Sequence, residues 1–269
     1  KKQKRKMAWL SIFVGAILAG ESIAATYRID KEANKDLVEE ISGLHVGSML
    51  AFKANCVNID ISGIEDAHGT SSEMGSLSVL VADEDWEPET PNILYFMQHD
   101  GTKPFPFRTN RFEWIIAEHF IEHITFAEAI EFLKESRRML IPGGTLRLST
   151  PDLAIYAAAF FDPAQRFFKE HYKLMTEAPG MEANKQFMST RRADMFNQIF
   201  YGYGHKHIYD ELELRTAAEL AGWTHSNGCE VNVASYRKGD NEDIAQLDDV
   251  VHQDESIYLE LTCGMTSQY

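Results

Sequence analysis

Cysteine is scarce in this chain, and its scarcity narrows the classes of protein that the chain can be. Three cysteines are present, Cys56, Cys229 and Cys263, and no two of them form a C-x-x-C pair. Disulfide-built domains use an even and dense set of cysteines, and cysteine-built zinc sites use closely spaced pairs. The pattern argues against a disulfide framework and against a cysteine zinc site, and it favours a reducing compartment.

Positive charge is also scarce beyond the first few residues. Five of the 26 lysines and arginines lie in the first six positions, so residues 7–269 hold 21 basic and 41 acidic residues, a net charge of −20. A body with this charge repels nucleic acid at long range. Proline and glycine together contribute only 25 of 269 residues, which is too few for a fibrous or disordered chain. The chain is long enough for one large domain with a sizeable core, or for two small ones.

A long apolar run is missing as well. The longest uncharged stretch near the N-terminus, residues 7–20, has 14 residues, whereas a membrane-spanning helix needs about 20. Its basic flank and the small residues at 22–24 are typical of a signal peptide. We therefore predict that residues 1–30 are a separate basic and hydrophobic segment. It is either a signal or a membrane anchor acting through residues 7–25, or a helix packed ahead of the domain. An anchor would place the basic flank on the cytoplasmic face.

Beyond this segment, runs of β-branched and apolar residues alternate with helical patterns. Residues 31–42, 126–140 and 210–220 carry helical patterns. The predicted strands are 43–48, 56–61, 93–97, 114–117, 145–150, 231–236 and 257–262, with 77–82 as a possible extra strand. The alternation predicts an α/β fold, a Rossmann-like, seven-stranded and mainly parallel sheet with helices on both faces. Residues 31–269 form the domain, with insertions at 62–92 and at the aromatic-rich, helical segment 153–204.

Ligands of such sheets bind beyond the carboxyl ends of the strands, so the strand ends indicate where a site lies. The sequence around them resembles a class I S-adenosylmethionine-dependent methyltransferase with a type 11 methyltransferase domain. The pieces that carry the resemblance are Leu44–Ser48, Val57–Asp60, His99–Asp100, Lys103–Phe107, Glu118–His123, Leu140–Arg147, Thr150–Asp152, His205–Asp210 and Ala221–Trp223.

The resemblance implies a cofactor, S-adenosyl-L-methionine, and a small-molecule methyl acceptor. Gly47 and Ser48 form the turn under the methionine part, where glycine lets the backbone come close. Asp60 faces the ribose hydroxyls, and Asp100 faces the adenine amino group. The other predicted cofactor contacts are His45, His99, Gly101 and Ala117.

The resemblance also implies catalytic residues. Glu118 and His119 lie beside the transferable methyl group, and His119 is the candidate general base because a neutral imidazole can accept a proton near pH 7. Tyr156, His205 and His207 are candidate substrate contacts. Methyl transfer of this kind requires no metal.

Two other functions fit the same residues. Met49 stands where a second glycine is usual, which favours a methyltransferase-fold protein that has lost catalysis and serves as a binding or scaffold module. Residues 119–123 also spell H-x-x-E-H, a zinc-hydrolase motif. On a helix, His119 and His123 would share one face and could bind one metal ion.

Overall fold

The computed structural model describes residues 27–30, 40–48, 51–65, 69–82, 93–177, 185 and 188–264. Most of the predicted N-terminal segment, most of the predicted helix at 31–42, and Met49 lie outside the described residues. Within the described ranges, no helix combines the length and the apolar character that crossing a bilayer requires.

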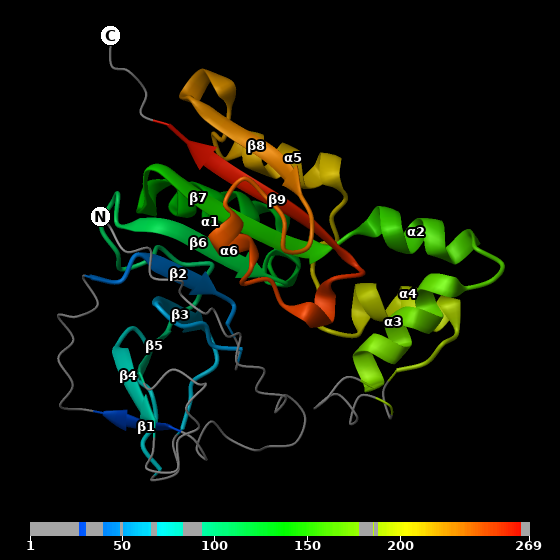
Figure 1. The fold of residues 1–269 in the computed structure, drawn as a ribbon, viewed down its shortest axis with the longest axis horizontal. Helices are drawn as coiled ribbons and strands as arrows, with labels where there is room; N and C mark the ends of the chain where they lie inside the picture. The colour runs from blue at the N-terminus through cyan, green and yellow to red at the C-terminus, as the bar shows by residue number, and fades with distance from the viewer. Residues whose placement is uncertain are drawn as a thin grey trace, which may run out of the picture.

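One sheet organises the molecule, and it differs from the prediction in having nine strands and mixed direction (Figure 1). The strand order is β1-β4-β5-β3-β2-β6-β7-β9-β8. Five central strands, β5, β3, β2, β6 and β7, run parallel to their neighbours, and the outer pairings are antiparallel. The strands are β1 Tyr27–Asp30, β2 Gly43–Val46, β3 Cys56–Asp60, β4 Leu77–Ala82, β5 Ile93–Gln98, β6 Phe112–Glu118, β7 Leu140–Pro151, β8 Cys229–Ala234 and β9 Ser256–Cys263.

The seven-strand prediction was wrong because two strands extend the sheet beyond β5. β4, from the predicted insertion at 62–92, pairs antiparallel with β5, and β1 then pairs antiparallel with β4. Tyr27 and Leu80 are buried with Leu94 and Phe96 in a separate apolar cluster at this edge. β1 has only four residues, too short a run to show a strand periodicity.

Helices cover both faces of the sheet. On β6, Ile115 belongs to the main core with α1 and α5, whereas Trp114 and Ile116 face the opposite side and pack with Ile244 of α6. This alternation follows from the two-residue period of a strand. The helices are α1 Phe126–Met139, α2 Leu153–Phe161, α3 Arg166–Glu177, α4 Arg192–Tyr201, α5 Glu211–Leu220 and α6 Glu242–Ala245, and the 3₁₀ helices are Ile121–His123, His225–Asn227 and Val250–His252.

The start of α1 is fixed locally. Thr125 and Glu128 form a capping box, in which the Thr125 hydroxyl accepts from the Glu128 backbone and the Glu128 carboxylate accepts from the Thr125 backbone. Two backbone N–H groups at the start of the helix thereby gain hydrogen-bond partners. α1 ends at Met139, and β7 begins at Leu140. The Pro-Gly-Gly run at 142–144 therefore lies within the first part of β7.

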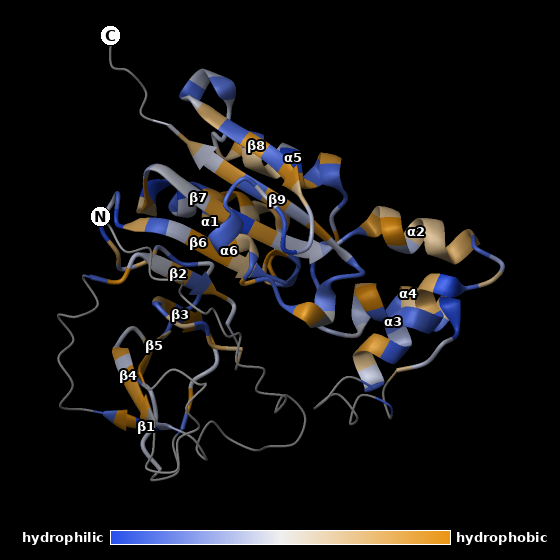
Figure 2. Cartoon of the chain, viewed as in Figure 1, coloured by the Kyte–Doolittle hydropathy of each residue, from blue (hydrophilic) through white to orange (hydrophobic). Residues whose placement is uncertain are grey.

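The aromatic-rich insertion forms its own helical unit beyond the end of β7 (Figure 1). α2 is apolar along most of its length (Figure 2), and it packs with α3 and α4. The buried apolar residues of this unit are Tyr156, Ala159, Phe168, Met188, Met195 and Ile199.

The expectation against disulfides needs a correction at one pair. The antiparallel register of β8 and β9 places Cys229 directly opposite Cys263, and a disulfide joins them. Cys56 is free and buried. The two bonded cysteines are 34 residues apart in sequence, and only the strand pairing brings them together.

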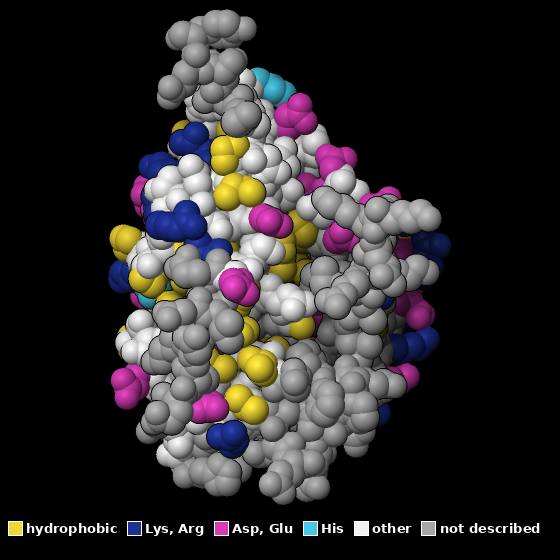
Figure 3. Space-filling model, turned by 60° about the vertical axis from the view of Figure 1, so that its left-hand side comes forward, with side chains coloured by type: hydrophobic (Ala, Val, Ile, Leu, Met, Phe, Trp, Pro, Cys, Tyr) yellow, Lys and Arg dark blue, Asp and Glu magenta, His cyan; other side chains and the backbone are white. Residues whose placement is uncertain are grey.

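The surface carries both charge signs. On the face shown in Figure 3, acidic and basic side chains are scattered among apolar and neutral ones, and no continuous basic surface is seen in its described part.

Candidate active site

A cavity of about 460 Å³ opens at the carboxyl ends of β2, β3, β5 and β6. Its volume lies within the range of about 300–1,000 Å³ that is usual for small-molecule sites. Four stretches that are far apart in sequence meet here, as the strand-end rule predicted. Six of the predicted site residues line the cavity, namely Gly47, Asp60, His99, Asp100, Gly101 and His119.

Two carboxylates lie on the cavity wall at neighbouring strand ends. Asp60 ends β3, is 8% exposed, and accepts a hydrogen bond from the Ser62 backbone at 2.8 Å. Asp100 follows β5 and accepts bonds from the backbone and hydroxyl of Thr102 at 2.9 and 2.7 Å. Burial raises the pKa of Asp100, but the Thr102 bonds outweigh it and hold the pKa below its ordinary value. Asp100 is therefore a charged hydrogen-bond acceptor at neutral pH.

Two turns around the cavity require glycine because the Phe120 ring fills the space beside them. Gly47 has a φ of +73°, and a Cβ there would lie 2.9 Å from Cβ of Phe120. A Cβ at Gly101 would lie 2.6 Å from Cζ of the same ring. His99 also lines the cavity, and its buried Nε2 has no hydrogen-bond partner among the described residues.

His119 lies just after β6 with a left-handed backbone, φ +46°. Nδ1 of the ring is 3.2 Å from Oε1 of Glu122, whose other oxygen accepts a bond from the Thr150 hydroxyl at 3.0 Å. Nε2 is 2.7 Å from Oγ of Ser256. The zinc-hydrolase alternative needs His119 on a helix, but the helical turn here is the 3₁₀ helix Ile121–His123, which starts after it.

Behind His119, a buried chain of polar groups reaches the helical insertion. The His252 ring stacks on His119 with centroids 3.7 Å apart, and its Nδ1 is 2.8 Å from Oε1 of Glu255. The Tyr156 hydroxyl donates to Oε2 of the same carboxylate at 2.6 Å, and Nε2 of His171 is 3.7 Å from that oxygen. Burial lowers the pKa of His252, but the hydrogen bond and charge of Glu255 outweigh it and raise the pKa to about 9.

Three predicted cofactor contacts lie behind the cavity wall instead of on it. His45 is buried in β2 with Nδ1 3.1 Å from Oδ1 of Asn58, and burial and Lys53 hold its pKa well below its ordinary value. Ala117 is buried in the main core. Ser48 is buried, and its hydroxyl has no hydrogen-bond partner among the described residues.

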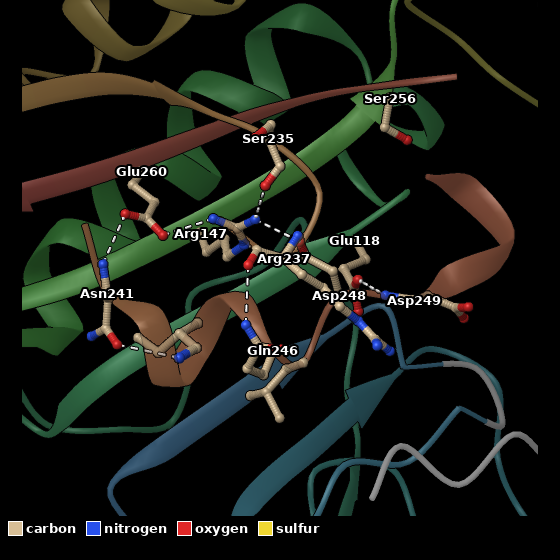
Figure 4. Close-up of polar contacts among 12 residues, drawn as sticks. Glu118, Arg147, Ser235, Arg237, Asn241, Gln246, Asp248, Asp249, Ser256 and Glu260 are labelled. Atoms are coloured by element: carbon tan, nitrogen blue, oxygen red, sulfur yellow. Dashed lines mark hydrogen bonds and ion pairs between the residues drawn. The ribbon is translucent and has the colours of Figure 1, made fainter. Parts of the chain in front are cut away.

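Glu118, predicted beside the methyl group, points away from the cavity. Its Oε2 is 2.6 Å from Nζ of the buried Lys53, and its Oε1 accepts from the Asp249 backbone at 2.7 Å (Figure 4). Lys53 also donates to the Leu247 carbonyl at 2.7 Å. Glu118 and His119 are adjacent in sequence and face opposite sides, so Glu118 anchors the loop around 247–249 while His119 lines the cavity.

The predicted substrate contacts also lie outside the cavity wall. Tyr156 is enclosed in the helical insertion. His205 packs against His123, with ring centroids 4.7 Å apart, and His207 is 3.0 Å from Oε1 of Glu213.

The lining residues that were not among the predicted cofactor, catalytic or substrate residues are Val46, Ile59, Ile61, Ser62, Thr102, Lys103, Phe120, His123, Ile124, Glu128 and Lys206. Phe120 and His123 lie within the H-x-x-E-H stretch, which is the one signal that marked them. Lys206 was not predicted, although its neighbours His205 and His207 were predicted substrate contacts.

Comparison with known proteins identifies the same segment. A family model described as a methyltransferase domain matches residues 42–148, and no curated protein matches the sequence. Solved structures that resemble the fold include S-adenosylmethionine-dependent methyltransferases from Archaeoglobus fulgidus (10% identity, 85% of this chain and 94% of that chain, TM-score 0.39) and Mesorhizobium loti (10%, 81% and 89%, 0.39).

A third similar structure is a protein from Nostoc punctiforme that is provisionally named as an O-methyltransferase (8% identity, 62% of this chain, TM-score 0.34), and this chain spans 35% of its length. At TM-scores below 0.5 these likenesses carry no weight, and the assignment rests on the family model together with the residues quoted above. Residues 42–148, which supply all four strand ends around the cavity, are therefore the part of the chain that matches a methyltransferase domain.

Proposed function

We propose that this protein transfers a methyl group from S-adenosylmethionine to a small-molecule acceptor. The observation that carries the proposal is the cavity at the ends of β2, β3, β5 and β6, where two carboxylates, two obligatory glycines and a histidine come together from separate stretches of the domain. S-adenosylmethionine, when bound, supplies a methyl group already activated on its sulfonium.

The residues of the cavity fit such a cofactor by their chemistry. Asp60 and Asp100 are acceptors at neighbouring strand ends, suited to the ribose hydroxyls and to the adenine amino group. Charged acceptors make stronger hydrogen bonds than neutral ones. The unpartnered Nε2 of His99 and the tight backbone at Gly47 supply a polar atom and a close backbone approach on the same wall.

The chain's part in the reaction is to position the acceptor and to receive its proton. Glu122 holds Nδ1 of His119 and would stabilise the imidazolium that forms, which leaves Nε2 as the basic nitrogen. In the described geometry the Ser256 hydroxyl lies 2.7 Å from both Nε2 and the His252 carbonyl, and a neutral His119 with its proton on Nδ1 requires that hydroxyl to donate to Nε2. An acceptor hydroxyl or amine would take the place of Ser256 as the partner of Nε2. Holding the acceptor atom close to the methyl group in this way would contribute to the rate of transfer.

Cofactor binding by the Asp60 carboxylate is directly testable with S-adenosylhomocysteine. We expect Asp60→Asn to weaken its binding by at least about tenfold, because hydrogen bonds to a charged group contribute about 1.5–3 kcal/mol. The amide oxygen can still accept from the Ser62 backbone, so the turn after β3 is kept. Isothermal titration calorimetry on the full chain measures the change.

The matched control is Asp194→Asn on α4, whose side chain is 46% exposed and lies outside the cavity. It should bind S-adenosylhomocysteine like the unaltered chain. If the unaltered chain shows no binding heat, or if Asp60→Asn binds equally well, the proposed cofactor site is wrong. Catalysis is tested by following S-adenosylhomocysteine release with phenols, amines, thiols and carboxylic acids in turn. If the chain binds the cofactor but releases S-adenosylhomocysteine no faster with any acceptor than without one, the scaffold alternative is favoured.

A further inference from the structure

A second group of ligand-bearing side chains adjoins the cavity and shares Glu122 with the proposed catalytic histidine His119. Glu122 and His123 come from the 3₁₀ helix after β6, and His205 comes from the loop after α4. Each offers one atom able to bind a metal ion, and the three atoms lie within 4.8 Å of one another. Glu122 is fully buried, and His123 lines the cavity. The group therefore lies between the interior and the cavity.

The backbone holds these three residues in place. The Lys206 and His207 amides both donate to the Glu122 carbonyl, at 2.7 and 3.2 Å. This pairing fixes the loop that carries His205 against the turn that carries Glu122 and His123. The site therefore needs no large rearrangement to form, which lowers the entropy cost of binding an ion.

The donor atoms of this group are available. Nδ1 of His205 is 2.6 Å from the Ile199 carbonyl, and because a carbonyl only accepts, Nδ1 carries the proton and the lone pair is on Nε2. Metal-binding histidines characteristically donate their other nitrogen to a carbonyl or carboxylate in this way. Oε1 of Glu122 is buried and accepts no hydrogen bond among the described residues, although Nδ1 of His119 lies 3.2 Å away as an ion-pair partner.

The neighbouring group of His119, His252 and Glu255 also has three ligand atoms within this spacing, but its ring geometry is less suited to binding one ion. His252 and Glu255 contact each other at 2.8 Å, and Nε2 of His119 contacts Ser256. The rings of His119 and His252 lie face to face, so their in-plane lone pairs do not converge on one point. The group at Glu122 is the better candidate.

We propose that Glu122, His123 and His205 bind one divalent transition-metal ion of the Zn²⁺ class. Two imidazoles and one carboxylate are a ligand set that suits Zn²⁺, and three protein ligands leave a fourth position open. Because His123 lines the cavity, this position would face it and could take an oxygen, nitrogen or sulfur atom of a bound molecule. Binding would draw the three ligand atoms closer, since zinc–nitrogen and zinc–oxygen distances are about 2.0–2.2 Å. The set differs from the H-x-x-E-H prediction, because His205 replaces His119.

The full chain is first stripped of metal with a chelator. It is then titrated with Zn²⁺ in a metal buffer, and separately with Co²⁺, whose binding is followed by visible absorption. We expect one ion per chain and a Co²⁺ spectrum typical of four-coordination. His205→Ala should weaken Zn²⁺ binding by about 100-fold or more, because losing a ligand costs at least as much as losing an outer-shell partner. Zn²⁺ should also raise the melting temperature of the unaltered chain, and it should raise that of His205→Ala much less.

The matched control is His207→Ala, two residues along the same loop, whose imidazole contacts Glu213 instead of the group. It should bind Zn²⁺ like the unaltered chain. His123→Ala serves as a second ligand variant if His205→Ala does not fold. The proposal is overturned if the unaltered chain does not bind one Zn²⁺ ion per chain. It is also overturned if a ligand variant binds Zn²⁺ as tightly as the unaltered chain, or if His207→Ala loses as much Zn²⁺ affinity as the ligand variants. S-adenosylhomocysteine calorimetry on the same samples separates a failed metal site from a failed cofactor site.

Discussion

Replacement of Arg147 by alanine is expected to lower the free energy of unfolding by about 3–5 kcal/mol. Arg147 lies in the middle of β7, and its side chain is 1% exposed. Its guanidinium binds both oxygens of Asp248 and donates to Oε1 of Glu260 at 2.7 Å and to the Ser235 carbonyl at 3.0 Å (Figure 4). Alanine would leave two buried carboxylates without their cation.

The loss extends beyond β7 because the same carboxylates hold the loop between β8 and β9. Oδ2 of Asp248 accepts from the Arg237 backbone at 2.8 Å, and Oε2 of Glu260 accepts from the Asp240 backbone at 2.6 Å. An unpaired charge in this interior strongly disfavours the folded state. Arg147→Lys keeps the charge and loses the two-pronged contact with Asp248, so its stability should fall between those of the unaltered chain and Arg147→Ala.

Urea unfolding followed by circular dichroism measures these differences. The control is Arg166→Ala, whose side chain is 83% exposed and pairs with Asp162; exposed pairs contribute up to about 1 kcal/mol. A loss for Arg147→Ala no larger than the control's would show that the buried network does not stabilise the fold. If Arg147→Ala yields no folded protein, the comparison of Arg147→Lys with Arg166→Ala decides the matter.

Raising the pH from about 6 to beyond 9 is expected to cost the chain about 2–3 kcal/mol of stability through His252. In the fold, Glu255 raises the pKa of His252 to about 9, above the ordinary 6.5, although burial opposes this. A raised pKa means that the folded state favours the imidazolium. Its contribution is fully present below pH 6.5 and is lost as the pH rises through about 9. The side chain retains 28% exposure, so solvent screening keeps the effect below the full shift.

The free energy of unfolding measured at pH 6, 8 and 9.5 tests this expectation. His252→Gln should be less stable at pH 6 and should show a flatter dependence on pH, because the titrating group is gone. His171 also faces Glu255. Burial lowers its pKa, but the charges of Glu255 and Asp254 outweigh burial and raise it. The stability of His252→Gln should therefore still fall with pH, but with a smaller slope. His225→Gln, at an exposed position, should keep the full slope. A chain equally stable at all three pH values would contradict the prediction.

The sequence alone indicated where the cavity lies because its signals are local. Apolar runs marked eight of the nine strands. The strand-end rule, that ligands bind beyond the carboxyl ends of parallel strands, then placed Gly47, Asp60, Asp100 and His119 around one cavity. β1 was not predicted because its four residues are too few to show the two-residue periodicity of a strand. The family resemblance assigned Glu118 to the cavity together with His119, but side chains alternate along a strand, and the buried Lys53 holds Glu118 on the other side.

What the sequence indicated by itself is eight of the nine strands, the helices α1 and α5, and the likeness of residues 42–148 to a methyltransferase domain, all of which depend on neighbouring residues. Only the tertiary structure decided the contacts between distant segments. Arg147 meets Asp248 and Glu260, Cys229 meets Cys263, and His205 meets Glu122 and His123 because strand register and loop packing bring them together. Nothing local in the chain encodes such pairs, since each depends on the free energy of the whole fold.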